Sequence, residues 1–178
     1  MQKRLSARSS GIVESVGSGG GSDSELSPVT PEIETEIPSL KLRLVREEDA
    51  EELSLRVDQN REHLRRWASW VDGNTTASDT LKFVRFCLEF ALSGTGFHYA
   101  LLLDGEIVGL VTFNCVEKIN RCATMGYWLA KSQTGRGLMT TAAKTLISEG
   151  FRQLELNRIQ ATVTTENYPV KASAIVWV

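Results

Sequence analysis

The chain has 178 residues, of which 42% are hydrophobic and 24% are charged, and this composition is typical of one soluble globular domain with a real core. Its formal net charge of -2 gives no overall basic character that would predict nucleic-acid binding. No apolar run approaches the length of a membrane span, so we expect no membrane partner.

Residues 1–39 differ from the rest of the chain. Serine and glycine runs there have the composition of flexible linkers, and three prolines punctuate an acidic stretch. We therefore expect a disordered leader over residues 1–39, followed by one folded domain over residues 40–178. Basic residues among the first serines also resemble the start of an organelle transit peptide, but the acidic residues that follow argue against that alternative.

The first predicted elements are a strand and three helical pieces. Residues 40–44 alternate between leucine and basic residues, which predicts a half-buried strand. Three consecutive acids then begin a helix, because acidic side chains suit the positive end of the helix dipole. A short helical piece is predicted over residues 60–71, and a longer helix follows a cap at Thr76 or Ser78. The sequence Ser-Gly-Thr-Gly at residues 93–96 ends that helix.

A strand pair follows the long helix. Asp104-Gly105 lies between residues 99–103 and 107–113, a strong hairpin signal because this dipeptide readily adopts positive φ angles. Gly109 inside the second strand indicates a close approach of two backbones.

The last predicted elements are a strand over residues 122–130, a helix over residues 138–154 and a strand from Ile159. A helix that connects two strands of one sheet makes them parallel. The sequence therefore predicts an α/β fold with a mixed sheet, and a ligand crevice at the carboxyl ends of the two parallel strands.

The loop at residues 133–139 reads Gln-Thr-Gly-Arg-Gly-Leu-Met and predicts an anion site. Gly135 and Gly137 let the backbone turn and expose consecutive N–H groups, and the helix that follows adds its own unpaired N–H groups. The natural ligand is a phosphate or pyrophosphate, with Arg136 either a cation at the rim or an ordinary surface residue. The loop is neither a Walker nor a Rossmann motif, so its ligand must be argued from its surroundings.

The cysteines and histidines exclude several chemistries. Cys87, Cys115 and Cys122 are odd in number and widely spaced, which predicts reduced, buried thiols in an intracellular protein, and we expect a cytoplasmic location. A catalytic cysteine would need a histidine partner, and the chain has only His63 and His98. Two histidines without clustered carboxylates also predict no metal site.

Several segments together resemble one family, the GNAT acetyltransferases, and within it the RimJ/RimL type, named for acetylation of ribosomal-protein N-termini. The resemblance extends from about Leu42 to Asn167. It rests on the following segments: the strand Gly-Tyr-Trp-Leu at 126–129, the loop Gly-Arg-Gly-Leu-Met-Thr at 135–140, Ala142, the Leu-x-x-Trp-x-x-Trp segment within 60–71, Phe151, Leu154, Leu-Asn-Arg-Ile at 156–159 and Glu-Asn at 166–167.

The resemblance implies acetyl-CoA as the donor. The N–H groups of residues 135–139 would hold its pyrophosphate, and the edge of residues 127–130 would hydrogen-bond the pantetheine arm like an added strand. An N–H near Leu129 would polarise the thioester carbonyl, and Asn167 would contact the cofactor from the other side. The implied cofactor-binding residues are Tyr127, Trp128, Leu129, Thr134, Gly135, Arg136, Gly137, Leu138, Met139 and Asn167.

The resemblance also implies an amine acceptor, with protein N-termini favoured over small amines. The attacking amine must be neutral, so a base or a water chain to one is expected. Trp67 and Trp70 either line the acceptor site or belong to the core. Glu117 is either the base or a solvated loop acid. Tyr127 and Trp128 point to opposite faces, so at least one of them packs in the core.

The chain departs from the family pattern in two places. Thr134 and Met139 take the first and last positions of a loop that usually reads Gln/Arg-x-x-Gly-x-Gly/Ala. Three residues after Asn167, where the resemblance implies a serine that protonates the departing thiolate, the chain has Val170, and Ser173 replaces it only in a shifted register. We therefore expect a GNAT fold that lacks its last two strands, with doubtful activity. The alternatives are a CoA-binding or regulatory isoform and a purely structural module, and the oligomeric state stays open.

Overall fold

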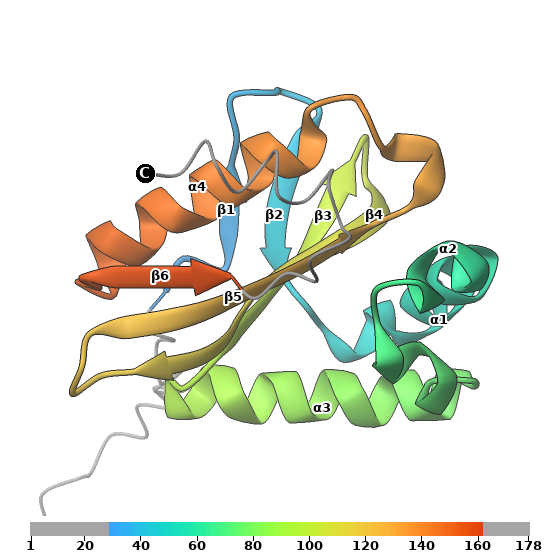
Figure 1. Ribbon diagram of the computed structural model, residues 1–178, viewed down its shortest axis with the longest axis horizontal. Helices are drawn as coiled ribbons and strands as arrows, with labels where there is room; N and C mark the ends of the chain where they lie inside the picture. Colours follow the sequence, from blue (N-terminus) through green and yellow to red (C-terminus); the bar gives the residue numbers. More distant parts are fainter. Residues whose placement is uncertain (1–28, 162–178) are drawn as a thin grey trace, which may run out of the picture.

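One mixed sheet organises residues 29–161, the part of the chain that the computed structural model describes (Figure 1). Its strands follow chain order across the sheet, and only the last pair is parallel. The strands are β1 (Glu32–Glu34), β2 (Leu40–Leu44), β3 (Phe97–Leu103), β4 (Glu106–Glu117), β5 (Cys122–Leu129) and β6 (Arg158–Ala161). The predicted mixed α/β fold with a parallel last pair is confirmed.

Helices cover both faces of this sheet. In Figure 1, α4 lies over one face, and α3 with α1 lies under the other. The helices and single 3-10 turns (η) are η1 (Glu47–Asp49), α1 (Ala50–Gln59), α2 (Arg61–Arg65), η2 (Ser69–Gly73), α3 (Ala77–Ser93), η3 (Lys131–Gln133) and α4 (Leu138–Gln153). The helix α4 connects β5 to β6, so the parallel pairing has the origin that the sequence predicted.

Alternation along the strands divides the core between the two faces. On the α4 face, Phe97, Tyr99 and Phe113 are buried against that helix, whereas Ala100 and Leu110 face α1 and α3. The prediction for the tandem aromatics of β5 is confirmed, since Tyr127 packs on the first of these clusters and Trp128 on the second. Trp128 also contacts a third, smaller cluster of buried residues from the α1–η2 region: Val57, Leu64 and Val71.

The helical segments agree with the predictions except at one break. Thr76 caps α3 by accepting a hydrogen bond from the N–H of Asp79, and Gly94 ends the helix with a φ of 67°. The helical piece predicted over residues 60–71 is instead two pieces, α2 and η2. They separate because Ala68 is extended, with a φ of -132° and a ψ of 101°.

Residues 29–39 are folded, so the prediction of disorder is wrong for them. β1 pairs antiparallel with β2 along its whole length, and Ile33 is buried in the core on the α4 face. The N–H of Thr30 donates to Oε1 of Gln153 at 2.7 Å, which ties the segment to α4. Strand pairing and the burial of Val29 and Ile33 order a stretch whose composition resembles a linker. The rest of the predicted leader lies outside the described residues.

The cysteine prediction is right for two residues and wrong for the third. Cys87 and Cys122 are buried, and burial raises the pKa of the Cys87 thiol to about 12, which leaves it unreactive. Cys115 is exposed. A register shift between Phe113 and Cys115 inserts Asn114 as a bulge, and this reverses which residues of β4 face α4. Val116 therefore takes the buried position instead of Cys115.

Among the described residues there is neither a helix that could span a membrane nor a cluster of metal ligands. No helix within residues 29–161 is long and apolar enough to cross a bilayer. In the same range, no three His, Cys, Asp or Glu side chains cluster as metal ligands would.

Candidate functional site

The glycine loop leads into a helix whose first N–H groups have no side-chain cap. Gly135 and Gly137 both have left-handed φ angles, of 77° and 78°, so both positions favour glycine. Gly137 is the N-cap of α4 and has no side chain to satisfy the first N–H groups of the helix. The first turn also contains no acidic residue. A Cβ at either glycine would meet no atom of the described structure within 4 Å, so the space in front of the loop is open to a ligand.

The loop is fixed where it leaves β5. The N–H of Ala130 donates to the carbonyl of Val108 in β4 at 2.8 Å. The next N–H, of Lys131, donates at 2.8 Å to Oδ1 of Asn60, which lies between α1 and α2. Oγ1 of Thr134 donates to the carbonyl of Lys131 at 2.8 Å and closes the η3 turn. The glycine loop therefore starts from a position that both the sheet and the helical region hold.

Positive charge gathers at this end of the sheet. Arg136 lies in the loop, and its guanidinium donates to Oε1 of Gln133. Burial lowers the pKa of His63, and the charges of Lys131 and Arg66 lower it further. Lys131 and Arg66 therefore place positive charge near His63, between α2 and the loop. Uncapped N–H groups beside such positive charge suit a phosphate or pyrophosphate.

The end of β5 directs a backbone N–H outward. Because the N–H of Ala130 bonds to Val108, the preceding pair, Gly109 and Leu129, is of the non-hydrogen-bonded kind. The N–H of Leu129 consequently points away from β4. Pairing of β5 with β6 is described for residues 122–125, which lie toward the other end of the strand. Leu129 thus presents its N–H close to the start of the glycine loop.

A polar row crosses the α3 face of the sheet, and sequence reasoning missed it. His98 of β3 lies opposite Thr112 of β4, which lies opposite Gly126 of β5. Oγ1 of Thr112 lies 2.7 Å from Oδ1 of Asn114 and 3.0 Å from the carbonyl of Gly126. A Cβ at Gly126 would come within 2.5 Å of Nδ2 of Asn114, so glycine makes room for that amide. The only sequence signal was the polar residues within apolar strands.

His98 is a buried, neutral imidazole. It is 5% exposed, and its Nδ1 has no hydrogen-bond partner among the described residues. The ring of Phe83 from α3 meets it edge-on, with centroids 5.7 Å apart. Burial lowers the pKa of His98 to about 4, so it serves at neutral pH as a hydrogen-bonding group and not as a base.

Burial of His98 predicts a loss of stability in mild acid. The folded pKa of about 4 lies below the ordinary 6.5, so the unfolded chain binds the proton more tightly. The contribution of neutral His98 to the free energy of unfolding is fully present above pH 6.5, and it is lost as the pH falls toward 4. Between pH 7.5 and 5 we expect His98 to reduce the free energy of unfolding by about 2 kcal/mol. Urea unfolding at both pH values of the protein and of His98→Gln measures this, since His63 titrates equally in both. An identical pH dependence in the two proteins would contradict the burial.

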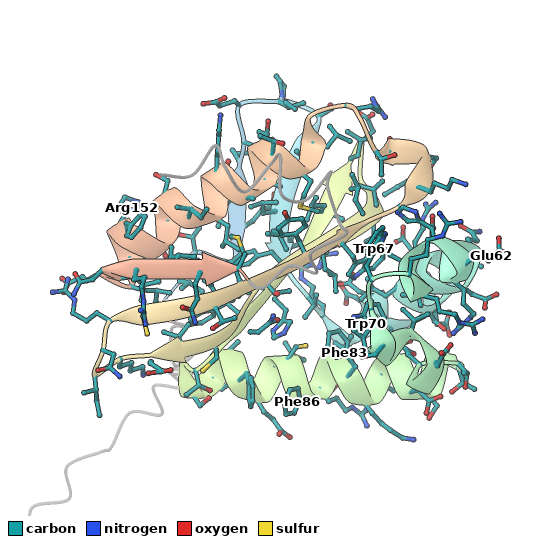
Figure 2. All side chains as sticks on the ribbon, in the orientation of Figure 1. Glu62, Trp67, Trp70, Phe83, Phe86 and Arg152 are labelled. Carbon is teal, nitrogen blue, oxygen red and sulfur yellow. The ribbon has the colours of Figure 1, made fainter. Side chains whose placement is uncertain are left out.

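Aromatic side chains form an exposed row beside the polar one. Trp67, Trp70, Phe83 and Phe86 are 37%, 45%, 36% and 48% exposed, and Figure 2 shows them along the side formed by the α2–η2 region and α3. The core interpretation of Trp67 and Trp70 is therefore wrong. Phe83 belongs to both rows, because it also contacts His98.

The remaining predicted site residues lie apart from the loop or outside the described part. Glu117 is exposed and accepts a hydrogen bond from Nδ2 of Asn120 at 2.9 Å. In the β4–β5 ladder it lies opposite Cys122. Cys122 begins β5 and Leu129 ends it, so Glu117 is about 23 Å from the loop end of the strand. The structure does not bring Glu117 together with the loop. Asn167 and Ser173 lie outside the described residues, and their roles stay predictions.

Residues 39–174 match the family model of the acetyltransferase (GNAT) domain. The chain belongs to the GNAT acetyltransferase family. This membership confirms the resemblance that the strand, loop and tryptophan segments indicated.

Two relatives and one solved structure that this GNAT chain resembles have names that refer to ribosomal acetylation. It is 31% identical over 136 residues to the putative ribosomal N-acetyltransferase YdaF of Bacillus subtilis, which covers 75% of this chain and 73% of that protein. It is 27% identical over 129 residues to the ribosomal-protein-serine acetyltransferase of Escherichia coli, at 72% of each chain. Among solved structures, RimL, a ribosomal L7/L12 alpha-N-protein acetyltransferase in complex with coenzyme A, superposes with a TM-score of 0.79, 26% identity and coverage of 82% and 81%.

Proposed function

We propose that the chain transfers an acetyl group from acetyl-CoA to the α-amino group of a protein N-terminus. The observation that carries the donor half is the uncapped start of α4 behind two left-handed glycines, next to the outward N–H of Leu129. The relatives support the acceptor half, because those named above acetylate ribosomal proteins or are described as doing so. A ribosomal-protein N-terminus is therefore the favoured acceptor, and a small amine is the alternative.

On this proposal the loop holds the diphosphate of the donor. The N–H groups of residues 135–139 would donate to the diphosphate, a Cβ at Gly135 or Gly137 would enter open space, and Arg136 and Lys131 add positive charge. The end of β5, residues 128–130, would hydrogen-bond the pantetheine arm. The donor supplies an activated thioester, and the N–H of Leu129 would stabilise the negative charge that develops on its carbonyl oxygen.

The α3 face would hold the acceptor. Asn114 presents an exposed, uncharged amide there, next to the buried Thr112 and His98, and such a group suits a neutral amine and its adjoining peptide group. Trp67 and Trp70 are exposed in the α2–η2 region and would contact the side chains that follow the acceptor amine. With these groups the chain positions the amine for direct attack on the thioester carbon.

Thiol release tests the proposal. The purified chain is incubated with acetyl-CoA and a mixture of peptides with free N-termini, and free CoA thiol is followed with a chromogenic thiol reagent. We expect release that depends on peptide, together with one added acetyl group on the peptide α-amine by mass spectrometry. Peptides with blocked N-termini are the control, and small amines are a separate arm.

The outcomes separate the candidates. Equal release with blocked and free peptides would contradict the N-terminal acceptor. Release with small amines alone would favour a small-molecule acetyltransferase. CoA binding without release would favour the CoA-binding isoform. Neither binding nor release would contradict the site itself.

A further inference from the structure

Asn60 and Arg61 join the glycine loop to a segment with two exposed tryptophans. This aromatic segment comprises residues 67–73, with Trp67 and Trp70. Asn60 lies at the end of α1 and the start of α2. Its Oδ1 accepts the N–H of Lys131 at 2.8 Å, and its Nδ2 donates to the carbonyl of Arg56 at 2.8 Å. One amide therefore caps α1 and holds the turn that leads into the glycine loop.

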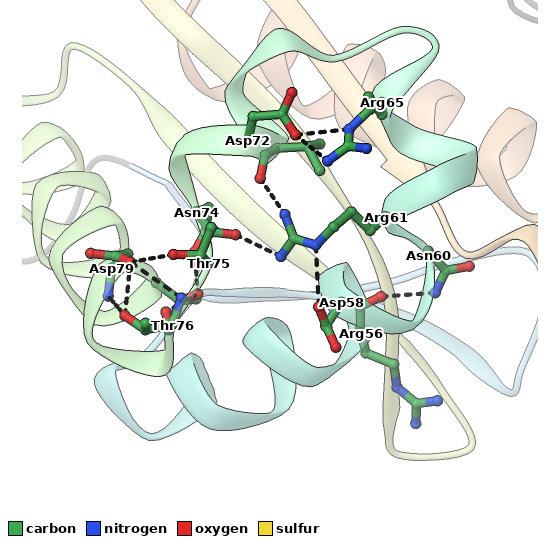
Figure 3. A network of polar contacts seen from close by, with 12 residues as sticks. Arg56, Asp58, Asn60, Arg61, Arg65, Asp72, Asn74, Thr75, Thr76 and Asp79 are labelled. Carbon is green, nitrogen blue, oxygen red and sulfur yellow. Dashed lines mark hydrogen bonds and ion pairs between the residues drawn. The ribbon is translucent and has the colours of Figure 1, made fainter.

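Arg61 extends the connection in the other direction, as Figure 3 shows. Its guanidinium donates to the carbonyl of Val71 at 2.6 Å and to that of Asn74 at 2.9 Å. Nε donates to Asp58 at 3.2 Å, so one side chain ties α1 to η2. The Arg61 side chain is only 22% exposed, which strengthens these bonds relative to surface contacts.

The far end of the connection is firmly packed. Val71 is fully buried, in the small cluster with Val57 and Leu64 against which Trp128 packs. A shift of Arg61 would therefore move Val71 and with it the aromatic segment. A shift of Lys131 would move Asn60, whose neighbour in the chain is Arg61. The loop and the aromatic segment thus share one short, hydrogen-bonded support.

We propose that Asn60 and Arg61 are positioning residues that couple occupancy of the glycine loop to the order of the aromatic segment. The inference rests on the proposed function, in which the loop binds the donor and the aromatic segment contacts the acceptor. A ligand that fixes the loop fixes Lys131, and through Asn60 and Arg61 it fixes the segment. Coupling is reciprocal, so an ordered segment also favours donor binding. We expect a coupling of about 5-fold in affinity, at the lower end of what is typical.

Hydrogen exchange with and without free CoA tests the coupling. In the wild-type protein, CoA is expected to slow exchange in residues 61–74. Asn60→Ala is expected to bind CoA about 5-fold more weakly and to lose this CoA-induced protection. Asn60→Asp retains an oxygen that accepts the N–H of Lys131, and this variant is expected to keep most of the CoA-induced protection. Glu62→Gln, an exposed change on α2, is the matched control and should behave as wild type.

Arg61→Lys is a second variant, for the case in which Asn60→Ala does not fold. Lysine cannot contact both carbonyls as the guanidinium does. We expect its KM for the peptide acceptor to rise several-fold and its affinity for CoA to fall by up to about 5-fold, as in Asn60→Ala, because the coupling is reciprocal. A purely structural role would lower stability without changing the CoA-induced increment in protection.

The results distinguish a failure of the coupling from a failure of the proposed function. Wild-type protein that binds CoA without protecting residues 61–74 would overturn the coupling and leave the proposed function standing. Asn60→Ala with the wild-type increment would do the same. Wild-type protein that binds no CoA would overturn the proposed function, and the coupling with it.

Discussion

Replacement of Gly137 by valine is expected to weaken CoA binding by at least about 100-fold, equivalent to about 3 kcal/mol. Gly137 has a φ of 78° and a ψ of -6°, and a β-branched residue is strongly disfavoured there. Valine would rotate the peptide that joins residue 137 to Leu138 and turn its N–H away from the ligand. Each hydrogen bond to a charged group contributes about 1.5 to 3 kcal/mol, so the loss of two accounts for the effect. Calorimetric titration with CoA measures it.

Gly105→Val is the matched control for that experiment. Gly105 has a φ of 89° in the β3–β4 hairpin, and its added Cβ would also meet no atom within 4 Å. Both variants therefore introduce the same kind of backbone strain into open space. We expect both to lower the free energy of unfolding, and only Gly137→Val to lose CoA affinity. Wild-type affinity in Gly137→Val would contradict the placement of the pyrophosphate at this loop.

The parts of the fold that the sequence predicted depend on local chemistry. Asp104 and Gly105 turn the β3–β4 hairpin because both adopt positive φ, as the dipeptide indicated. The glycine loop could be predicted for the same reason, since Gly135 and Gly137 need left-handed angles wherever the rest of the chain lies. Such signals need only a few neighbouring residues. The turn of the glycine loop is therefore predictable from the sequence, and its ligand stays a prediction.

The parts that the sequence did not predict depend on register and on distant contacts. β1 has three residues and buries one of them, Ile33, so its pattern is too short to stand out from linker composition. The bulge at Asn114 changes which face of the sheet Cys115 occupies. No local sequence pattern indicates that a strand contains one extra residue. The polar row brings together residues of β3, β4 and β5 that become neighbours only in the observed register.

The support of the aromatic segment illustrates the same limit. Asn60 and Lys131 are 71 positions apart in the chain, and the bond between them joins a side chain to a backbone N–H. Backbone N–H groups are the same at every residue, so the sequence contains no mark of the partner. The acceptor side that we propose depends largely on contacts of this kind. It therefore had to be read from the structure.

Gly109→Ala is expected to lower the free energy of unfolding by about 3 kcal/mol, at the upper end for overpacking. The added Cβ would lie 2.3 Å from the carbonyl oxygen of Trp128 and 3.1 Å from Cα of Leu129. Both are backbone atoms, so β4 and β5 would have to separate to accommodate one methyl group. This is the close backbone approach that a glycine within a strand predicted. The midpoint and slope of urea unfolding measure the change.

Gly73→Ala provides the comparison, because a Cβ there would meet nothing within 4 Å and no left-handed angle is involved. We expect its free energy of unfolding to stay within about 0.5 kcal/mol of wild type. Separation of the strands in Gly109→Ala would also displace Leu129, whose outward N–H we assign to the thioester carbonyl. Folded Gly109→Ala should therefore lose acetyl transfer more than CoA affinity, since the glycine loop itself is unchanged. A variant as stable and as active as wild type would mean that β4 and β5 do not approach as closely as described.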